Sequence, residues 1–128
     1  MTNAPDLTTV ADTYLAAYNE RDAGRRAQLI AAAFSEDGRL VDPPVDGQGH
    51  DGIDAVARAM HEQFAGHRFR RVSPVDAHHD RLRFAWELLG PADDVVLTGM
   101  DVGELAADGR LARITGFFGD LPGAEGPR

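Results

Sequence analysis

Two β-rich runs near the end of the sequence, residues 95–105 and 111–119, constrain the fold more than any other feature. The dipeptide Asp108-Gly109 lies between them, and an Asp-Gly turn flanked by β-branched and aromatic runs is typical of a β-hairpin. Because side chains alternate along a strand, every second residue of the first run shares one face. These residues are Val95, Leu97, Gly99, Asp101, Gly103 and Leu105. The sequence therefore predicts a hairpin that carries one carboxylate among aliphatic residues and glycines.

Asp101 is the first candidate functional residue, because its face of the strand is the one expected to be covered. A buried carboxylate without a partner is unfavourable, so it stays protonated or acquires a partner. The alternative is that the opposite face of the strand is covered and that Asp101 is solvated. The hairpin alone leaves both interpretations open.

Composition limits the chemistry that the chain can use. Its 128 residues are expected to form one domain, residues 1–128, with an ordered core of about residues 6–120 and a flexible tail at 121–128. The chain has no cysteine, and all 13 basic residues are arginine, which excludes thiolate and Schiff-base lysine chemistry. The two serines, Ser35 and Ser73, do not lie in a nucleophile-elbow pattern.

The formal net charge of −8 disfavours nucleic acids and anionic membranes as partners. No apolar run approaches the length of a membrane span, and the first residues lack the basic-then-apolar pattern of a signal peptide. We therefore expect a cytoplasmic protein.

Helical periodicity is confined to the first half of the chain. A first helix, capped by Asp6 or Thr8, is predicted to run to about Glu20, and a second is predicted over residues 23–34. A third helix is predicted to begin at residue 51 or 52 and to end near residue 65. Each segment has one apolar face.

Strand patterns surround and follow these helices. Asp37-Gly38 is predicted to end the second helix and to start a short strand over residues 39–42, which stops at Pro43-Pro44. Residues 45–51 read as a glycine-rich loop. Later strands are predicted at residues 68–77, with Pro74 at a bulge or edge position, and at residues 81–89.

Helices followed by a meander of strands predict an α+β fold, with three helices on the concave side of a curved antiparallel sheet that encloses a pocket. The opposite face of the sheet would then carry four apolar side chains. These are Val96, Met100, Val102 and Phe117. Because a monomer rarely exposes so large an apolar patch, we expect a homodimer through this outer face.

Three polar residues are candidates for one site in the pocket. Tyr14 lies on the inner face of the first helix, Asp42 ends the first strand and Asp101 projects from the fourth. Each residue also has a simpler explanation. A tyrosine on an apolar helix face is usually part of the core, and an aspartate before proline usually forms a turn.

The order of these residues and their surroundings resembles the nuclear-transport-factor-2-like superfamily, which includes SnoaL-like and ketosteroid isomerase-like domains. The pattern is most similar to the ketosteroid isomerases. The resemblance extends over residues 10–119, and the matching segments are 14–19, 41–43, 52–56, 100–102 and 116–119. It implies the cone-shaped, cystatin-like α+β fold of that superfamily.

The resemblance also implies a role for each candidate residue. Tyr14 corresponds to the tyrosine of an oxyanion hole, Asp42 to the general base, and Asp101 to a protonated aspartic acid that donates a second hydrogen bond. General-base catalysis contributes about 10²–10⁴-fold, and each oxyanion donor roughly 3–4 kcal/mol. Donation by Asp101 requires that burial keep its carboxyl neutral near pH 7.

Seven residues are expected to contact the substrate: Tyr18, Met60, Phe64, Phe84, Trp86, Ile114 and Phe118. Met60 stands where the isomerases usually have another tyrosine, and the polar run at residues 46–50 indicates a substrate more polar than a steroid. His78 and His79 are expected in a turn. Because neighbouring strand residues face opposite ways, the two histidines cannot both enter one site. The alternative is that one of the two histidines reaches the pocket.

The leading hypothesis is an enzyme without cofactor or metal that acts on a small hydrophobic carbonyl compound, most specifically by isomerising a β,γ-unsaturated ketone. The first alternative is a SnoaL-like polyketide cyclase, dehydratase or epoxide hydrolase that uses Asp101 as an acid. The second is a non-catalytic module that binds small molecules or dimerises.

Overall fold

The computed structural model describes residues 6–123, which form three helices and seven strands. The helices are α1 (Leu7–Asn19), α2 (Ala23–Ala33) and α3 (Gly49–Gln63). The strands are β1 (Phe34–Asp42), β2 (Val45–Gln48), β3 (Arg68–Arg71), β4 (Asp76–His78), β5 (Arg81–Leu89), β6 (Val95–Leu105) and β7 (Leu111–Phe118). Most of the expected flexible tail, residues 124–128, lies outside the described residues.

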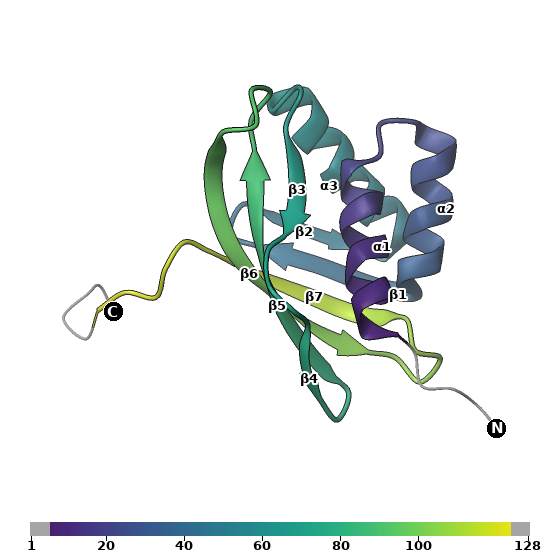
Figure 1. The fold of residues 1–128 in the computed structure, drawn as a ribbon. Helices are drawn as coiled ribbons and strands as arrows, with labels where there is room; N and C mark the ends of the chain where they lie inside the picture. The colour runs from purple at the N-terminus through teal and green to yellow at the C-terminus, as the bar shows by residue number, and fades with distance from the viewer. Residues whose placement is uncertain (1–5, 124–128) are drawn as a thin grey trace.

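The strands form one curved sheet in the order β2-β1-β7-β6-β5-β3, with β4 paired to β5. Figure 1 shows the three helices on one side of this sheet. Neighbouring strands are antiparallel except β1 and β7, so the sheet is mixed and not the antiparallel one that the sequence predicts. Three helices packed on one face of a curved sheet confirm the predicted α+β fold.

The first two helices begin at capped positions, whereas α3 begins at Gly49, earlier than the predicted residue 51 or 52 and without a side-chain cap. The Asp6 side chain accepts hydrogen bonds from the backbone N–H groups of Thr8 and Thr9, so Asp6 is the cap of α1. Asp22 caps α2 in the same way by accepting from the Arg25 N–H. Within residues 6–123, no helix combines the length and apolar character that crossing a membrane requires.

The first strand is longer than predicted, because Asp37-Gly38 lies inside β1 and does not end a helix. Phe34 is the first residue of β1, and the pairing of β1 with β7 shifts register between Phe34 and Arg39. A side chain at Gly38 would place its Cβ 2.8 Å from the Phe34 Cβ. Glycine is therefore required at position 38, where the strand bulges over Phe34. The prediction that Asp37-Gly38 ends a helix is wrong for this reason.

The segment predicted as a loop, residues 45–51, contains β2 and the start of α3. A Cβ at Gly47 would lie 2.7 Å from the Gly52 carbonyl oxygen, so β2 packs directly against the first turn of α3. The glycines of this segment allow that close approach, which explains why a glycine-rich run here is not a free loop.

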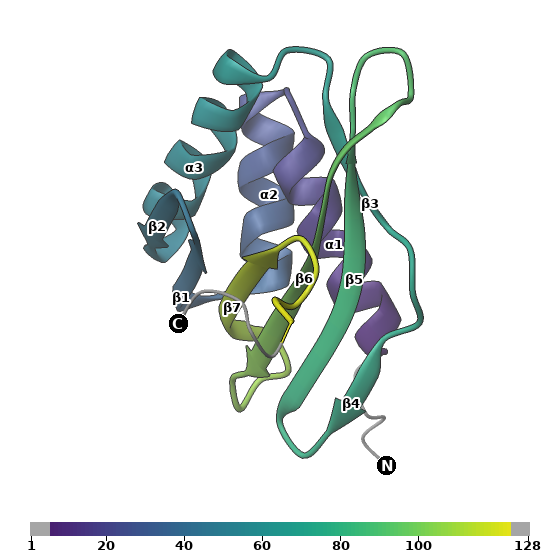
Figure 2. The same ribbon diagram turned by 90° about the vertical axis from the view of Figure 1, so that its left-hand side faces the viewer.

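The single strand predicted over residues 68–77 is two strands, β3 and β4, separated around Pro74. Next to this proline, the Ala85 N–H of β5 donates to Ser73 Oγ at 2.8 Å. A side chain thus replaces the backbone ladder where proline interrupts it. Figure 2 shows that the β4–β5 hairpin lies at the opposite end of the molecule from the connection between α3 and β3.

The β6–β7 hairpin forms as predicted, and Asp101 lies on its covered face with 4% of its surface exposed. Met100 and Phe117 face the outer side. The prediction that Val96 also faces outward is wrong. The register of β5 with β6 shifts next to Leu89, and the resulting bulge turns Val96 toward the helices.

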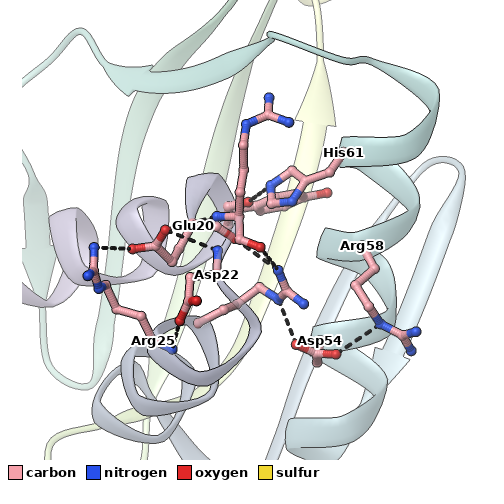
Figure 3. A network of polar contacts seen from close by, with 9 residues as sticks. Glu20, Asp22, Arg25, Asp54, Arg58 and His61 are labelled. Carbon is pink, nitrogen blue, oxygen red and sulfur yellow. Dashed lines mark hydrogen bonds and ion pairs between the residues drawn. The ribbon is translucent and has the colours of Figure 1, made fainter.

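A buried ion pair fixes the turn between α1 and α2 onto α3 (Figure 3). Arg26 is 3% exposed; its Nε donates to Asp54 at 2.6 Å, and its Nη1 donates to the carbonyl oxygens of Glu20 and Arg21. Asp54 also accepts from Arg58. These contacts hold the end of α1, the helix that carries both site tyrosines, against α3.

Candidate functional site

Asp42, Gly116 and Asp101 lie side by side on three neighbouring strands. Asp101 of β6 is the direct partner of Gly116 in β7, and Val41 of β1 pairs with Thr115, so Asp42 follows in register beside Gly116. A Cβ at Gly116 would lie 2.8 Å from Asp101 Oδ1 and 2.9 Å from the Asp42 Cβ. The missing side chain of Gly116 therefore brings the two carboxyl groups together on the concave face.

Asp101 is buried without a basic partner among the described residues. Desolvation by burial raises the pKa of its carboxyl to about 7, although a hydrogen bond with the Tyr14 hydroxyl opposes this shift. The Trp86 indole lies beside the same carboxyl and also lowers the pKa, but its N–H makes no well-aligned hydrogen bond. The environment thus favours the neutral acid far more than water does.

Tyr14 is 3% exposed and is packed edge-on against three aromatic rings. The ring centroids of Phe34 and Phe84 lie 5.7 Å and 6.3 Å from that of Tyr14. Burial and the nearby Asp101 raise the pKa of the Tyr14 phenol well above its usual value. Its hydroxyl is therefore a neutral hydrogen-bond donor at any physiological pH.

Asp42 differs from Asp101 in being half-buried. Its Oδ1 is inaccessible to solvent and has no hydrogen-bond partner in the described part of the chain. Burial raises the pKa of the Asp42 carboxyl to about 6, and a hydrogen bond from the Val45 backbone opposes this rise. Near pH 7 this carboxylate is ionised and more basic than an ordinary aspartate.

A cavity of about 580 Å³ opens beside Asp42, between the sheet and α3. Its wall is mainly apolar, and it includes Asp42 together with four of the seven predicted contact residues. These four are Tyr18, Met60, Phe64 and Phe118. Tyr18 also lines a second hollow of about 10 Å³ beside Tyr14, which is too small for a ligand.

The other three predicted contact residues belong to the core. Phe84 packs against Tyr14, Trp86 lies over Gly99 and beside Asp101, and Ile114 is completely buried in β7. None of the three lines the cavity. Tyr14 and Asp101 do not line it either, so they form the layer of buried side chains behind Asp42 and Gly116.

His78 and His79 lie at the tip of the β4–β5 hairpin, away from the cavity. Their Nδ1 atoms are 3.1 Å apart, and His79 has a positive φ of 53°. His79 lies in the turn, as predicted, whereas the same prediction for His78 is wrong, because His78 ends β4 and pairs with Arg81.

Several cavity residues have no clear signal in the sequence. Gln63 lines the cavity from the end of α3 and His67 from the connection between α3 and β3, and Val96 lines it because of the β6 bulge. Gly116 lies between the two carboxyl groups, and this position follows only from the register of β7 with its neighbouring strands. Gly116 belongs to a segment that matches the family, but only the strand pairing explains why this position is glycine.

The fold and the paired carboxyl groups define a cone-shaped, nuclear-transport-factor-2-like domain. The model of the SnoaL-like domain family matches residues 11–114, and the chain belongs to this family. The predicted resemblance is thereby confirmed. A search of curated protein sequences gave no match.

Solved structures support the same assignment. A proposed isomerase of the SnoaL-like family from Agrobacterium tumefaciens is 41% identical, with a TM-score of 0.84 over 88% of this chain and 97% of that one. A proposed polyketide cyclase from Sinorhizobium meliloti is 18% identical, with a TM-score of 0.66 over 84% and 93% of the two chains.

A protein with a ketosteroid isomerase-like fold from Catenulispora acidiphila, in complex with trimethylamine, is 11% identical and has a TM-score of 0.69. That match covers 89% of this chain and 85% of the other. At this identity, as for the cyclase, the similarity concerns the fold alone.

Proposed function

We propose that the protein is an enzyme that removes a proton from the carbon next to a carbonyl group and stabilises the resulting enolate. The observation that carries this proposal is the pair of carboxyl groups, Asp42 and Asp101, on either side of Gly116 and next to an apolar cavity. Their pKa values, raised to about 6 and about 7, favour an ionised base and a protonated acid in one site.

Asp42 is the general base of this proposal. Its side chain lines the cavity, and no group in the described part of the chain neutralises it through Oδ1, which has no hydrogen-bond partner there. A pKa near 6 keeps the carboxylate ionised at pH 7 while raising its affinity for the proton that it must remove. Positioned bases of this kind contribute about 10²–10⁴-fold to a rate.

Asp101 and Tyr14 are the proposed donors to the enolate oxygen, which has to pass Gly116 to reach them because neither residue lines the cavity. A Cβ at Gly116 would lie 2.8 Å from Asp101 Oδ1, so any side chain at this position would block a substrate oxygen from the Asp101 carboxyl. The Tyr14 hydroxyl lies beside the same carboxyl and carries no charge of its own, because the pKa of the phenol is well above its usual value. Donors held in a water-excluded site stabilise a developing negative charge by roughly 3–4 kcal/mol each.

The most specific form of the reaction is the isomerisation of a β,γ-unsaturated ketone. Asp42 takes the α proton, the electron pair of the C–H bond forms the dienolate, and the same carboxyl returns the proton to the γ carbon. The substrate is neither oxidised nor reduced. The relative from Agrobacterium tumefaciens, itself a proposed isomerase, supports this form of the proposal.

The test is the conversion of a small β,γ-unsaturated ketone such as cyclohex-3-en-1-one, followed by the absorbance of the conjugated product. We expect wild-type protein to accelerate the conversion and Asp42→Asn to remove most of that acceleration. Equal rates for the two proteins would exclude Asp42 as the base.

A second candidate function is that of a cyclase, dehydratase or hydrolase in which Asp101 is the proton donor. The observation that favours it is the burial of Asp101, which is 4% exposed and whose carboxyl has a pKa raised to about 7 by desolvation. In this case Asp101→Asn lowers activity more than Asp42→Asn does, whereas the isomerase proposal gives the opposite order.

We also propose that the protein forms a homodimer through the outer face of the sheet. Val72, Met100 and Phe117 are 45%, 40% and 58% exposed around a groove of about 540 Å³ on this face. Light scattering on wild type and Phe117→Arg tests the proposal. We expect a dimer for wild type and a monomer for the variant, and a wild-type monomer would overturn it.

A further inference from the structure

Two polar side chains, Gln63 and His67, line the same cavity as Asp42. Gln63 ends α3 and His67 lies in the connection from α3 to β3, whereas Asp42 ends β1. In the sheet, β1 and β3 are four strand spacings apart, roughly 19 Å along a flat sheet and less across a curved one. One apolar cavity thus has polar groups at two well-separated ends.

His67 is held in one orientation. Its Nδ1 lies 3.1 Å from the Ala65 carbonyl oxygen, and because a carbonyl only accepts, Nδ1 carries the proton. Its ring packs edge-on against Phe64, with centroids 5.5 Å apart. In the neutral ring, Nε2 therefore carries a lone pair, and no group among residues 6–123 donates a hydrogen bond to it.

The backbone around His67 is fixed as well. The Asn19 side chain accepts from the Phe69 N–H and donates to the Phe69 carbonyl, both at 2.8 Å. These two bonds tie the start of β3 to the end of α1. The imidazole of His67, two residues before Phe69, is therefore part of the cavity wall and has a defined position.

We propose that His67 is a specificity residue that accepts a hydrogen bond from a hydroxyl at the distal end of an elongated substrate, with Gln63 beside it. This inference rests on the proposed function, which places the reacting carbonyl at Asp42 and Asp101. The substrate class is then an extended, largely apolar ketone with a donor group at the end opposite the reacting carbonyl. A hydroxyl satisfies the Nε2 lone pair, whereas an ether or a methyl group does not.

The test uses three phenols that mimic the enolate at one end and differ at the other. They are 4-phenylphenol, 4-hydroxy-4′-methoxybiphenyl and 4,4′-dihydroxybiphenyl. Binding is measured by calorimetry or as inhibition of ketone isomerisation. After correction for the twofold symmetry of the diol, we expect wild type to bind the diol about three- to tenfold more tightly than the methoxy compound.

The variant His67→Phe keeps an aromatic ring against Phe64 but removes the acceptor. We expect it to lose the preference for the diol and to bind 4-phenylphenol within about twofold of wild type. The matched control is His78→Phe, which removes a histidine outside the cavity and keeps the preference. The wild-type comparison of the diol with the methoxy compound requires no variant to fold.

The outcomes separate this inference from the proposed function. If wild type binds 4-phenylphenol but shows no preference for the diol, the role of His67 is wrong and the enzyme proposal stands. A preference that survives in His67→Phe also overturns the assignment. If no phenol binds, the proposed function fails, and the inference fails with it.

Discussion

Two buried polar sites in this small domain are built in opposite ways. Between the helices, Arg26 donates to Asp54 and to two backbone carbonyls, so that its charge is compensated. On the sheet, Asp42 and Asp101 have no ion pair in the described residues, and Asp42 Oδ1 lacks any hydrogen-bond partner. The first site holds the helices together, whereas the second keeps two carboxyl groups desolvated and without an ion pair among residues 6–123.

Under the proposed function, burial stabilises the fold at the helix site and prepares the carboxyl groups for chemistry at the sheet site. A paired buried charge is sensitive to the loss of its partner, because the remaining group is left uncompensated. An unpaired buried carboxyl responds instead through its pKa, which is raised in both aspartates. Substitutions at the helix site are therefore expected to affect folding, and those at the sheet site to affect catalysis.

The largest expected effect is on the rate. Asp42→Asn should lower kcat/KM for ketone isomerisation by about 10²–10⁴-fold, because the amide cannot take up the proton. Its free energy of unfolding should be equal to or higher than that of wild type, since an unpartnered carboxylate is removed. Urea melts and absorbance kinetics on the same samples measure both quantities.

The matched control for this variant is Asp46→Asn. Asp46 lies on the neighbouring strand β2, where it is exposed and bound to Arg39 at 2.6 Å. Its substitution should leave the rate within about twofold of wild type. A comparable loss in both variants would show that the effect of Asp42→Asn is not specific to the site.

The second effect concerns stability as a function of pH. Asp101 has a pKa of about 7 in the folded protein and about 4 in the unfolded chain, so the folded state binds the extra proton between these values. The stabilising contribution of the neutral acid is complete below pH 4 and is lost as pH rises to 7. The loss is on the order of 4 kcal/mol.

Asp101→Asn should remove this pH-dependent loss, because an amide does not ionise. Urea melts of wild type and variant from pH 4.5 to pH 8 give the comparison. The difference in unfolding free energy between the two should shift in favour of the variant as pH rises. Parallel curves would contradict the burial of an acid with a raised pKa.

The third effect is a loss of stability at the helix site. Arg26→Met should destabilise the fold by about 2–3 kcal/mol, which is less than for a fully buried pair because Asp54 is partly exposed and retains Arg58. Arg25→Met removes an exposed pair with Glu20 and should change stability by less than about 0.5 kcal/mol. Thermal and urea melts measure both variants. Equal losses of stability in Arg26→Met and Arg25→Met would show that the buried pair is worth no more than the exposed one.

The smallest effect is geometric. Gly116→Ala should lower kcat/KM by about tenfold or more, because the new Cβ meets both carboxyl side chains at under 3 Å. Gly123→Ala, where no atom lies within 4 Å of the added Cβ, is the control. An unchanged rate in Gly116→Ala would indicate that the spacing of the carboxyl groups is not critical.

The sequence was sufficient to predict the architecture, because hydrophobic periodicity and turn residues are local signals. The Asp6 cap, the strand at residues 81–89 and the inward face of Asp101 are all as predicted. Glycine misled the prediction at Gly38 and Gly47, where close packing and not a turn requires it. Such contacts between distant segments leave no local pattern.

The candidate site was predictable only in part. Alternation along β6 placed Asp101 on the inner face, and the residue before Pro43 marked the end of β1. The parallel pairing of β1 with β7 brings Asp42 beside Gly116, and nothing local in the sequence specifies this pairing. The cavity wall at His67 and Val96 likewise depends on a helix connection and a bulge.

The most direct test of the account is a carbon-detected NMR titration of the Asp42 and Asp101 carboxyl groups in the wild-type protein. The account predicts that both titrate above their usual range, Asp42 near pH 6 and Asp101 near pH 7. Midpoints near pH 4 for both residues would contradict it, because neither carboxyl would then be held in the unpaired, desolvated state on which the chemistry depends.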